Sequence, residues 1–200
     1  MSKKPSRRRI VLASSSPYRR ALLERLGLPF SCRAPEIDES PRPGEGTRAL
    51  VRRLSIAKAR AVGAHEPDAI VIGSDQAGEL EGEILNKPGS VDRAIAQLRR
   101  ASGHRASFLT GLCVLDARSG EMAAAVERCE VRFRSLTDSA IRDYVRRERP
   151  VDCAGSFKVE GLGVALFEQI GLRDPTALEG LPLIRLTTLL ERMGVRVLGG

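Results

Sequence analysis

The chain has 200 residues, with 33 Lys and Arg against 25 Asp and Glu, which gives a formal net charge of +8. This length suits one domain or two small lobes, and 42% hydrophobic residues exclude a chain too polar to bury a core. Aromatic residues make up only 4% and Trp is absent, which disfavours a nucleic-acid platform built on stacked bases.

A basic arm precedes the first apolar run. Its charged residues are Lys3, Lys4, Arg7, Arg8 and Arg9. Short blocks of like charge are usually solvated, so we expect a flexible arm over residues 1–9 and a single domain over 10–200. Contact of the arm with nucleic acid is the alternative interpretation.

The cysteines and histidines predict no metal or redox centre. The sequence has no C-x-x-C pair, and its four cysteines are Cys32, Cys113, Cys129 and Cys153. No secretory segment precedes them, and no apolar stretch approaches the roughly 20 residues that span a bilayer. We therefore expect a cytoplasmic protein with reduced thiols and no membrane partner. The two histidines lie among polar neighbours and suit neither a zinc site nor a Ser-His-Asp triad.

The first half of the chain reads as alternating strands and helices. A short strand at 10–13 leads through Ser16-Pro17, a capping pair, into a helix at 18–26. After a loop rich in Pro and acidic residues, Thr47 is expected to cap a helix that runs to about Gly63. Residues 68–73 suit a strand buried on both faces, with Ser74-Asp75-Gln76 following directly at its C-terminal end.

The second half predicts further strands of a mixed sheet. The expected elements are a hairpin at 79–85, a helix at 91–101 capped by Ser90, strands at 107–116 and 123–133, a helix from Thr137 to before Pro150, a Gly-rich loop at 153–163, a short strand at 164–167, a helix at 183–193 and a strand at 195–198. This order predicts an α/β fold, with two lobes around a cleft as one arrangement.

Two clusters at expected strand ends suggest chemistry. Residues 14–20 combine hydroxyls, free N–H groups at a helix start, and two arginines, which favours a phosphate site; a well-capped helix is the alternative. Asp75 after a buried strand is a candidate general base or metal ligand, or else it closes an Asx turn.

A third cluster is the loop at 154–163, whose three glycines allow close approach to a ligand. Lys158 and Glu160 place opposite charges in this loop, which otherwise is a flexible turn with a solvated ion pair. Neither a P-loop nor a complete dinucleotide fingerprint occurs.

Together these clusters resemble the Maf-like nucleoside triphosphate pyrophosphatases. The resemblance is carried in order by L-A-S-S-S-P at 12–17 with Arg19-Arg20, A-P-E-I-D-E at 34–39, A-K-A at 57–59, I-G-S-D-Q at 72–76, K-P-G at 87–89, C-A-G-S-F-K-V-E-G at 153–161 and G-L-P-L at 180–183. Tyr18 after Ser-Pro, Gln76 after the Asp, and Ser-Phe-Lys-x-Glu in the late loop are similar to the 7-methyl-GTP branch rather than the dTTP/UTP branch.

The resemblance implies an elongated mixed sheet with flanking helices and two lobes around a central cleft. It implies hydrolysis of 7-methyl-GTP to the monophosphate and diphosphate, with Mg²⁺ or Mn²⁺ as cofactor and Asp75 as the proton acceptor. Tyr18, Gln76 and Glu160 match positions tied to substrate choice. The residues that match the phosphate side are Ser14, Arg19, Arg20, Lys58, Lys87 and Lys158, and those that match the metal site are Glu36 and Asp75.

The resemblance also implies a small-molecule nucleotide as partner and allows a homodimer, without stable binding of nucleic acid. A pyrophosphatase for other nucleotides, including dTTP and UTP, is the first alternative. A basic nucleic-acid-binding protein is the alternative from another class.

Overall fold

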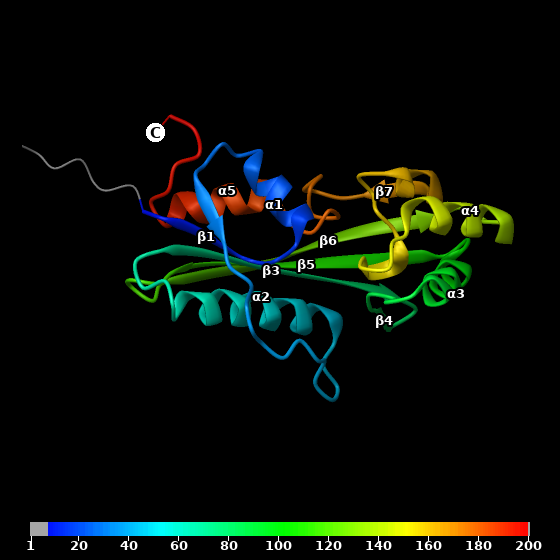
Figure 1. The fold of residues 1–200 in the computed structure, drawn as a ribbon, viewed down its shortest axis with the longest axis horizontal. Coiled ribbons are helices and arrows are strands. Elements are labelled where there is room, and N and C mark those ends of the chain that lie inside the picture. The colour runs from blue at the N-terminus through cyan, green and yellow to red at the C-terminus, as the bar shows by residue number, and fades with distance from the viewer. Residues whose placement is uncertain (1–7, 200) are drawn as a thin grey trace, which may run out of the picture.

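The computed structural model describes residues 8–199, which form an elongated molecule built on one mixed sheet of seven strands (Figure 1). The strands are β1 (Ile10–Ala13), β2 (Phe30–Cys32), β3 (Ile70–Leu80), β4 (Glu83–Leu85), β5 (Arg105–Asp116), β6 (Met122–Phe133) and β7 (Phe167–Gly171). Their order is β2-β1-β3-β5-β6-β7, with β4 paired to β3. β1 runs parallel to β2 and β3, and every other pair is antiparallel. The predicted mixed α/β sheet is confirmed.

Helices cover both faces of this sheet. They are α1 (Pro17–Glu24), α2 (Thr47–Gly63), α3 (Val91–Ala101), α4 (Asp138–Glu148) and α5 (Leu183–Arg192), with short 3₁₀ helices η1 (Ala154–Ser156) and η2 (Leu162–Leu166). Figure 1 shows α1 and α5 on one face and α2 on the opposite face, while α3 and α4 lie toward the other end of the long strands. Within residues 8–199, no helix has the length and apolar character needed to cross a bilayer.

Two regions of the core differ in composition. What we call the aliphatic lobe comprises β1, β2, α1, α2 and α5 with the parts of the long strands that pack against them, where Leu12, Ile72 and Leu186 represent a core of aliphatic side chains. What we call the aromatic lobe comprises β4, β7, α3, α4, η1 and η2. There the rings of Phe108, Phe133, Phe157 and Phe167 meet edge to face with centroids 4.8 to 6.3 Å apart. The long strands β3, β5 and β6 join the two lobes.

Three of the predicted helix caps are confirmed, and the fourth, Thr47, is wrong. The side-chain oxygens of Ser16, Ser90 and Thr137 each accept the backbone N–H three residues further on, as N-caps do. The N-cap of α2 is Gly46, and the Thr47 hydroxyl donates to the Glu79 carboxylate at 2.6 Å instead of capping the helix.

The predicted strands at 164–167 and 195–198 are wrong. Residues 162–166 form η2, β7 begins at Phe167, and no strand is assigned over 195–198, where Val195 and Val197 pack against the aliphatic core. Apolar runs this short fit any buried segment.

The predicted end of the central strand is also wrong, because β3 continues to Leu80. Residues 70–79 pair with β5, so Asp75 lies inside a long strand rather than after it. The reason lies in the partner strand, whose 12 residues supply hydrogen bonds far past the apolar run. Asp75 therefore lies on a rigid element.

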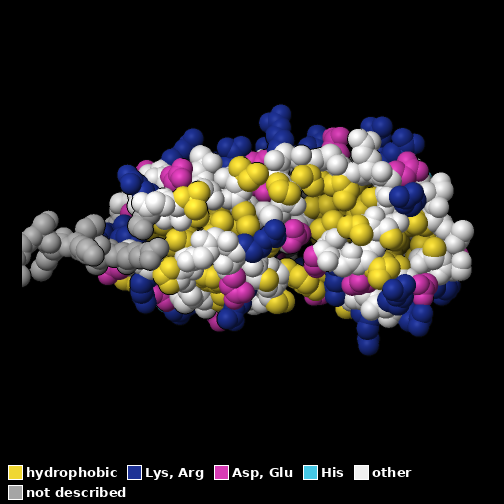
Figure 2. Space-filling view, turned by 90° about the horizontal axis from the view of Figure 1, so that it is seen from above, with side chains coloured by type: hydrophobic (Ala, Val, Ile, Leu, Met, Phe, Trp, Pro, Cys, Tyr) yellow, Lys and Arg dark blue, Asp and Glu magenta, His cyan; other side chains and the backbone are white. Residues whose placement is uncertain are grey.

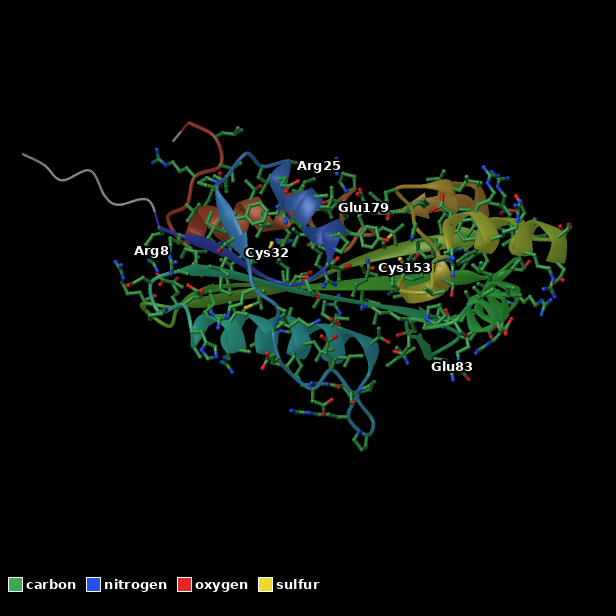
Figure 3. The ribbon with its side chains drawn as sticks, viewed as in Figure 1. Arg8, Arg25, Cys32, Glu83, Cys153 and Glu179 are labelled. Carbon is green, nitrogen blue, oxygen red and sulfur yellow. The ribbon has the colours of Figure 1, made fainter. Side chains whose placement is uncertain are left out.

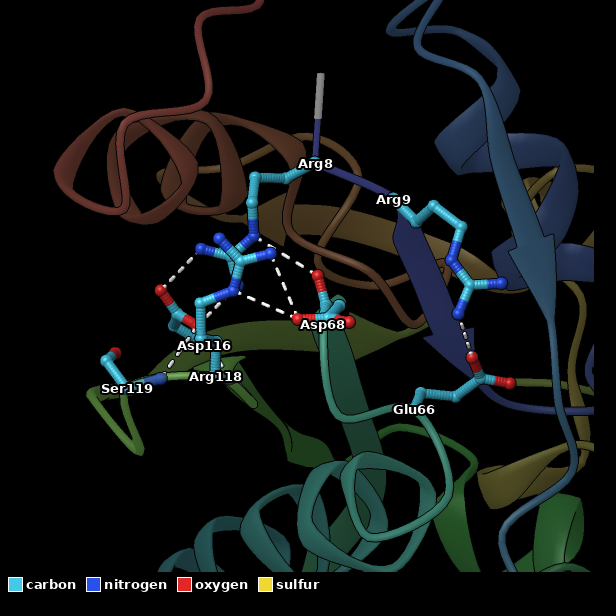
Figure 4. A network of polar contacts seen from close by, with 7 residues as sticks. All are labelled: Arg8, Arg9, Glu66, Asp68, Asp116, Arg118 and Ser119. Atoms are coloured by element: carbon cyan, nitrogen blue, oxygen red, sulfur yellow. Dashed lines mark hydrogen bonds and ion pairs between the residues drawn. The ribbon is translucent and has the colours of Figure 1, made fainter. Parts of the chain in front are cut away.

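The start of β1 is fixed by ion pairs (Figure 4). The Arg8 guanidinium donates to Asp116 at 2.8 and 2.5 Å, and Arg9 pairs with Glu66 at 2.6 Å. These two arginines belong to the predicted basic arm, and residues 1–7 of that arm lie outside the described residues. The hydrogen bonds from Arg8 hold the pKa of the Asp116 carboxyl well below its usual range.

Candidate active site

Two adjoining hollows lie between the lobes. The larger, which we call the main cleft, encloses about 500 Å³, and its polar lining includes Ser14, Ser15, Ser16, Tyr18, Arg19, Glu39, Lys58, Asp75, Gln76, Asn86, Lys87 and Asp152. The smaller, which we call the side pocket, encloses about 90 Å³ and is lined among others by Tyr18, Gln76, Lys87, Asp152, Cys153, Phe157, Glu160 and Glu179. In Figure 3, Cys153 and Glu179 mark the side-pocket region beside α1. Six polar side chains line both hollows, so one elongated ligand can occupy both; they are Ser16, Tyr18, Arg19, Gln76, Lys87 and Asp152.

A buried charge pair forms one wall of the main cleft. The Lys58 ammonium lies 2.6 Å from an Asp75 carboxylate oxygen and 3.0 Å from Glu39. Only 5% of Lys58 and 7% of Asp75 are exposed. Buried charges need partners, and this lysine supplies one for each carboxylate.

Close packing of α2 on β3 makes this pair possible. A Cβ atom built on Gly73 would lie 2.1 Å from the Ser55 carbonyl oxygen, so only glycine allows the helix this near. The predicted helix at 47–63 thus places Lys58 directly beside Asp75 across the layer.

The start of α1 forms the opposite wall. The Ser14 hydroxyl accepts the Ser16 N–H at 3.1 Å, and Arg19 Nε donates to the Gly180 carbonyl at 3.0 Å. Burial lowers the pKa of Arg19, while the charges of Asp75 and Glu39 raise it. Backbone N–H groups and a guanidinium at a helix N-terminus bind anions well.

Arg20 lies outside the main cleft, unlike the adjacent Arg19. Its side chain is exposed and pairs with Glu24 at 3.1 Å, one turn along α1. It lines neither hollow. The structure therefore brings Ser14, Arg19, Lys58 and Lys87 together at the main cleft, and places Arg20 outside it.

Gln76 is held from one side. Its Nε2 lies 3.0 Å from the carbonyls of Ala177 and Leu178 and 3.1 Å from the Thr110 hydroxyl. These three acceptors occupy the amide nitrogen, so the carbonyl oxygen is the group that Gln76 can offer to a ligand.

Tyr18 joins the two hollows, with Lys158 close to its ring. Lys158 Nζ lies 5.9 Å from the Tyr18 ring centroid and donates to the Glu148 carbonyl at 3.0 Å. Lys158 lines neither hollow, so its charge lies near the aromatic side chain rather than along the main cleft. Burial raises the pKa of Tyr18, and the hydrogen bond with Lys158 lowers it.

Three carboxylates line the side pocket, those of Asp152, Glu160 and Glu179. Glu160 was expected from the sequence, whereas Asp152 and Glu179 were not. Burial raises the pKa of Glu179, the nearby charge of Glu160 adds to this, and Arg25 at 3.7 Å opposes it. No local signal marks Glu179, since it lies far along the chain and only the fold brings it here.

The acidic loop contributes a different residue from the expected one. Glu36 is exposed and lines neither hollow, whereas Glu39 lines the main cleft and contacts Lys58. The sequence placed Glu39 in the same acidic loop but gave no reason to single it out. Residues 8–199 hold no group of three or more His, Cys, Asp or Glu side chains that could bind a metal ion.

Two carboxylates of the cleft, those of Asp75 and Glu39, contact the same ammonium, that of Lys58. Oxygen donors of this kind fit Mg²⁺, which takes one or two carboxylates and completes its shell with water and substrate phosphates. The donor set therefore fits a divalent cation that arrives with a phosphate ligand.

The comparisons with known proteins agree along nearly the whole chain. A family model described as "Maf-like protein" matches residues 9–193. A protein of Nitrosococcus oceani named "7-methyl-GTP pyrophosphatase" is 55% identical over 94% of this chain and 95% of its own length. A protein of the same name from Pseudomonas aeruginosa is 54% identical over 94% of this chain and 98% of its own length.

A solved structure, "The structure of the Staphylococcus aureus Ham1 protein", shares the fold with a TM-score of 0.54. It covers 93% of this chain and 100% of its own, at 17% identity. This likeness concerns the arrangement of the sheet and helices alone.

Proposed function

The chain belongs to the Maf-like protein family, and on that premise we propose that it hydrolyses 7-methyl-GTP to 7-methyl-GMP and diphosphate. The observation that carries the proposal is the buried Asp75 carboxylate held 2.6 Å from Lys58 in a cleft lined by cations. The relatives at 54 and 55% identity carry the name of this activity.

The reaction requires a water molecule to attack the α-phosphorus while the bond to the β-phosphate oxygen breaks. Asp75 accepts the proton of that water, the new oxygen stays on the monophosphate, and diphosphate leaves. Arg19, Lys58 and Lys87 face the main cleft and supply positive charge to the leaving group. The N-terminus of α1 offers further N–H donors to the phosphates.

A divalent cation adds a second source of positive charge. Asp75 and Glu39 would hold it together with phosphate oxygens, and when bound it would neutralise charge that develops on the phosphates. Glu39 takes the place that the resemblance gave to Glu36, because Glu39 alone of the two lines the cleft.

The side pocket accounts for the choice of base. Methylation at N7 makes guanine cationic, and the pocket presents the carboxylates of Glu160 and Glu179 beside the Tyr18 ring. Opposite charge strengthens hydrogen bonds to the base, and the ring attracts a cation by about 0.5–2 kcal/mol. An unmethylated, neutral guanine lacks the positive charge that strengthens these hydrogen bonds and the attraction to the ring.

The first test is diphosphate release from 7-methyl-GTP, GTP, dTTP and UTP, each with Mg²⁺ or Mn²⁺. We expect 7-methyl-GTP to be turned over fastest, and Asp75→Asn to lower kcat about 10²- to 10⁴-fold because it removes the proton acceptor. Preferred turnover of another nucleotide would support the proposed hydrolysis to monophosphate and diphosphate, and would reject the proposed preference for 7-methylguanine. Absence of turnover would favour the nucleic-acid-binding alternative, although Figure 2 shows basic side chains spread among acidic ones on the face drawn.

The second test compares Glu39→Gln with Glu36→Gln, a matched pair from one loop. Glu39→Gln should raise the Mg²⁺ concentration for half-maximal activity about tenfold, since it removes one of the two cleft carboxylates that contact Lys58. Glu36→Gln should leave it unchanged, because Glu36 lies outside both hollows. If Glu36→Gln raises the Mg²⁺ requirement and Glu39→Gln does not, Glu36 is the metal ligand instead.

A further inference from the structure

Gln97, on α3, joins two loops of the aromatic lobe that carry ligand-facing residues. They are residues 86–89, here the Lys87 loop, and residues 153–161, here the Glu160 loop. Its side-chain Nε2 donates to the Asn86 carbonyl at 2.9 Å, and its Oε1 accepts the Ser156 hydroxyl at 2.5 Å. Asn86 directly precedes Lys87, and Ser156 lies four residues before Glu160. Gln97 itself lines neither hollow, so it touches both loops without facing the ligand.

The loop that receives Ser156 has an unusual backbone. Ser156 has φ +62°, and Gly155 before it has φ +73°, so two consecutive residues adopt the left-handed region. A serine in this conformation costs free energy and persists only where its surroundings hold it. Ser156 is fully buried, and its hydroxyl hydrogen-bonds to Gln97, which is therefore one of the contacts that holds it.

α3 is a suitable anchor for such a link. The helix buries Ala94 and Leu98 in the aromatic core, so Gln97 projects from a fixed element. The residues just before the Glu160 loop also meet the Lys87 loop, through a backbone bond from the Gly89 N–H to the Val151 carbonyl at 2.9 Å. The side-chain link through Gln97 adds to that bond and connects the parts nearest Lys87 and Glu160.

We propose that Gln97 is a positioning residue that couples the Lys87 loop to the Glu160 loop, so that the phosphate-facing and base-facing groups of the aromatic lobe hold the nucleotide as one unit. The nucleotide part of this inference rests on the proposed function. Gln97 acts through Lys87 and Glu160, and it leaves Asp75, which α2 and β3 hold, unaffected.

Gln97→Met tests the proposal, since Met keeps the length and helix propensity of Gln but makes neither hydrogen bond. We expect KM for 7-methyl-GTP to rise three- to tenfold with kcat within twofold of the parent. Gln97→Glu keeps the acceptor for Ser156 and loses the donor to Asn86. Its KM should therefore lie between that of the parent and that of Gln97→Met. Arg93→Met, at an exposed position of the same helix, should change neither parameter.

A double-mutant cycle separates positioning from general stability. If Gln97 acts through Lys87, adding Gln97→Met to Lys87→Ala should raise KM by less than it does in the parent. Full additivity with Lys87→Ala, or a fall in kcat that matches the rise in KM, would overturn the proposal.

Backbone hydrogen exchange gives a readout that needs no substrate. In Gln97→Met, amides in 86–89 and 153–161 should exchange faster together, while those of β1 and β3 keep the parent rate. Unchanged exchange in both loops would overturn the coupling. Faster exchange in a protein that hydrolyses none of the nucleotides would support the coupling and reject the proposed function instead.

Discussion

The aliphatic lobe presents Lys58 and Asp75 from a helix and a strand, whereas the aromatic lobe presents Lys87 and Glu160 from loops. Both lobes share β3, β5 and β6, so the difference comes from what covers the sheet. α2 packs on β3 with no room for a side chain at Gly73. In the aromatic lobe, the loop at 153–161 covers the phenylalanine cluster and depends on left-handed backbone at Gly155 and Ser156.

Under the proposed function, this difference divides two tasks between two kinds of structure. The proton acceptor would need a position fixed to a fraction of an ångström, which regular elements supply. Selection of a base needs side chains of particular chemistry around a small pocket, which loops supply while tolerating sequence change. Substitutions in the aliphatic lobe should therefore affect folding and turnover together, and those in the aromatic-lobe loops should affect nucleotide choice first.

Gly73→Ala should have the largest effect. The new Cβ would lie 2.1 Å from the Ser55 carbonyl oxygen, which is backbone and cannot rotate away. α2 would have to move off β3, so we expect a loss of about 3 kcal/mol or more in unfolding free energy, and a loss of turnover. Denaturant unfolding measures the first and diphosphate release the second.

Gly171→Ala is the matched control, because a Cβ at this exposed position meets no atom nearer than the Glu130 carbonyl oxygen at 3.7 Å, an ordinary contact. It should unfold within about 0.5 kcal/mol of the parent, as exposed substitutions do. A fully stable and active Gly73→Ala protein would show that the packing of α2 is not what fixes Asp75.

Glu160→Gln should have a smaller effect, confined to nucleotide choice. It removes one of the three carboxylates of the side pocket, so the preference for 7-methyl-GTP over GTP should fall about tenfold while turnover of GTP is kept. Glu168→Gln, on the exposed side of β7, serves as the control. An unchanged ratio of kcat/KM values for the two nucleotides would remove Glu160 from base selection.

Asp116→Asn should have the smallest effect, at the end of the aliphatic lobe where Arg8 binds (Figure 4). The pKa of Asp116 is lowered in the folded protein, so its contribution is complete above the ordinary carboxyl pKa and is lost as pH falls through the lowered value. The variant should lose about 1 kcal/mol of unfolding free energy at pH 7, and this loss should shrink in acid. Denaturant unfolding at several pH values measures it, and a loss that does not change with pH would contradict the ion pair as its cause.

Much of the architecture could be predicted from local signals. The capping residues Ser16, Ser90 and Thr137 start their helices as expected, because a cap needs only a side chain and the backbone three residues on. The predicted strand at 164–167 was wrong because a few apolar residues suit a buried 3₁₀ turn equally well. β2 was missed because its three residues are partly or fully exposed and show no apolar run.

The sequence by itself determined the residue types of the site and their order: serines before a helix, an Asp after an apolar run, and a glycine-rich loop with Lys158 and Glu160. Local patterns carry this information because each depends on neighbours within a few positions. Only the tertiary structure decided that Glu39 rather than Glu36 lines the cleft, that Arg20 points away, and that Glu179 joins Glu160. These outcomes depend on contacts between segments far apart in the chain, such as α2 on β3. The spacing of residues within one segment does not predict such contacts.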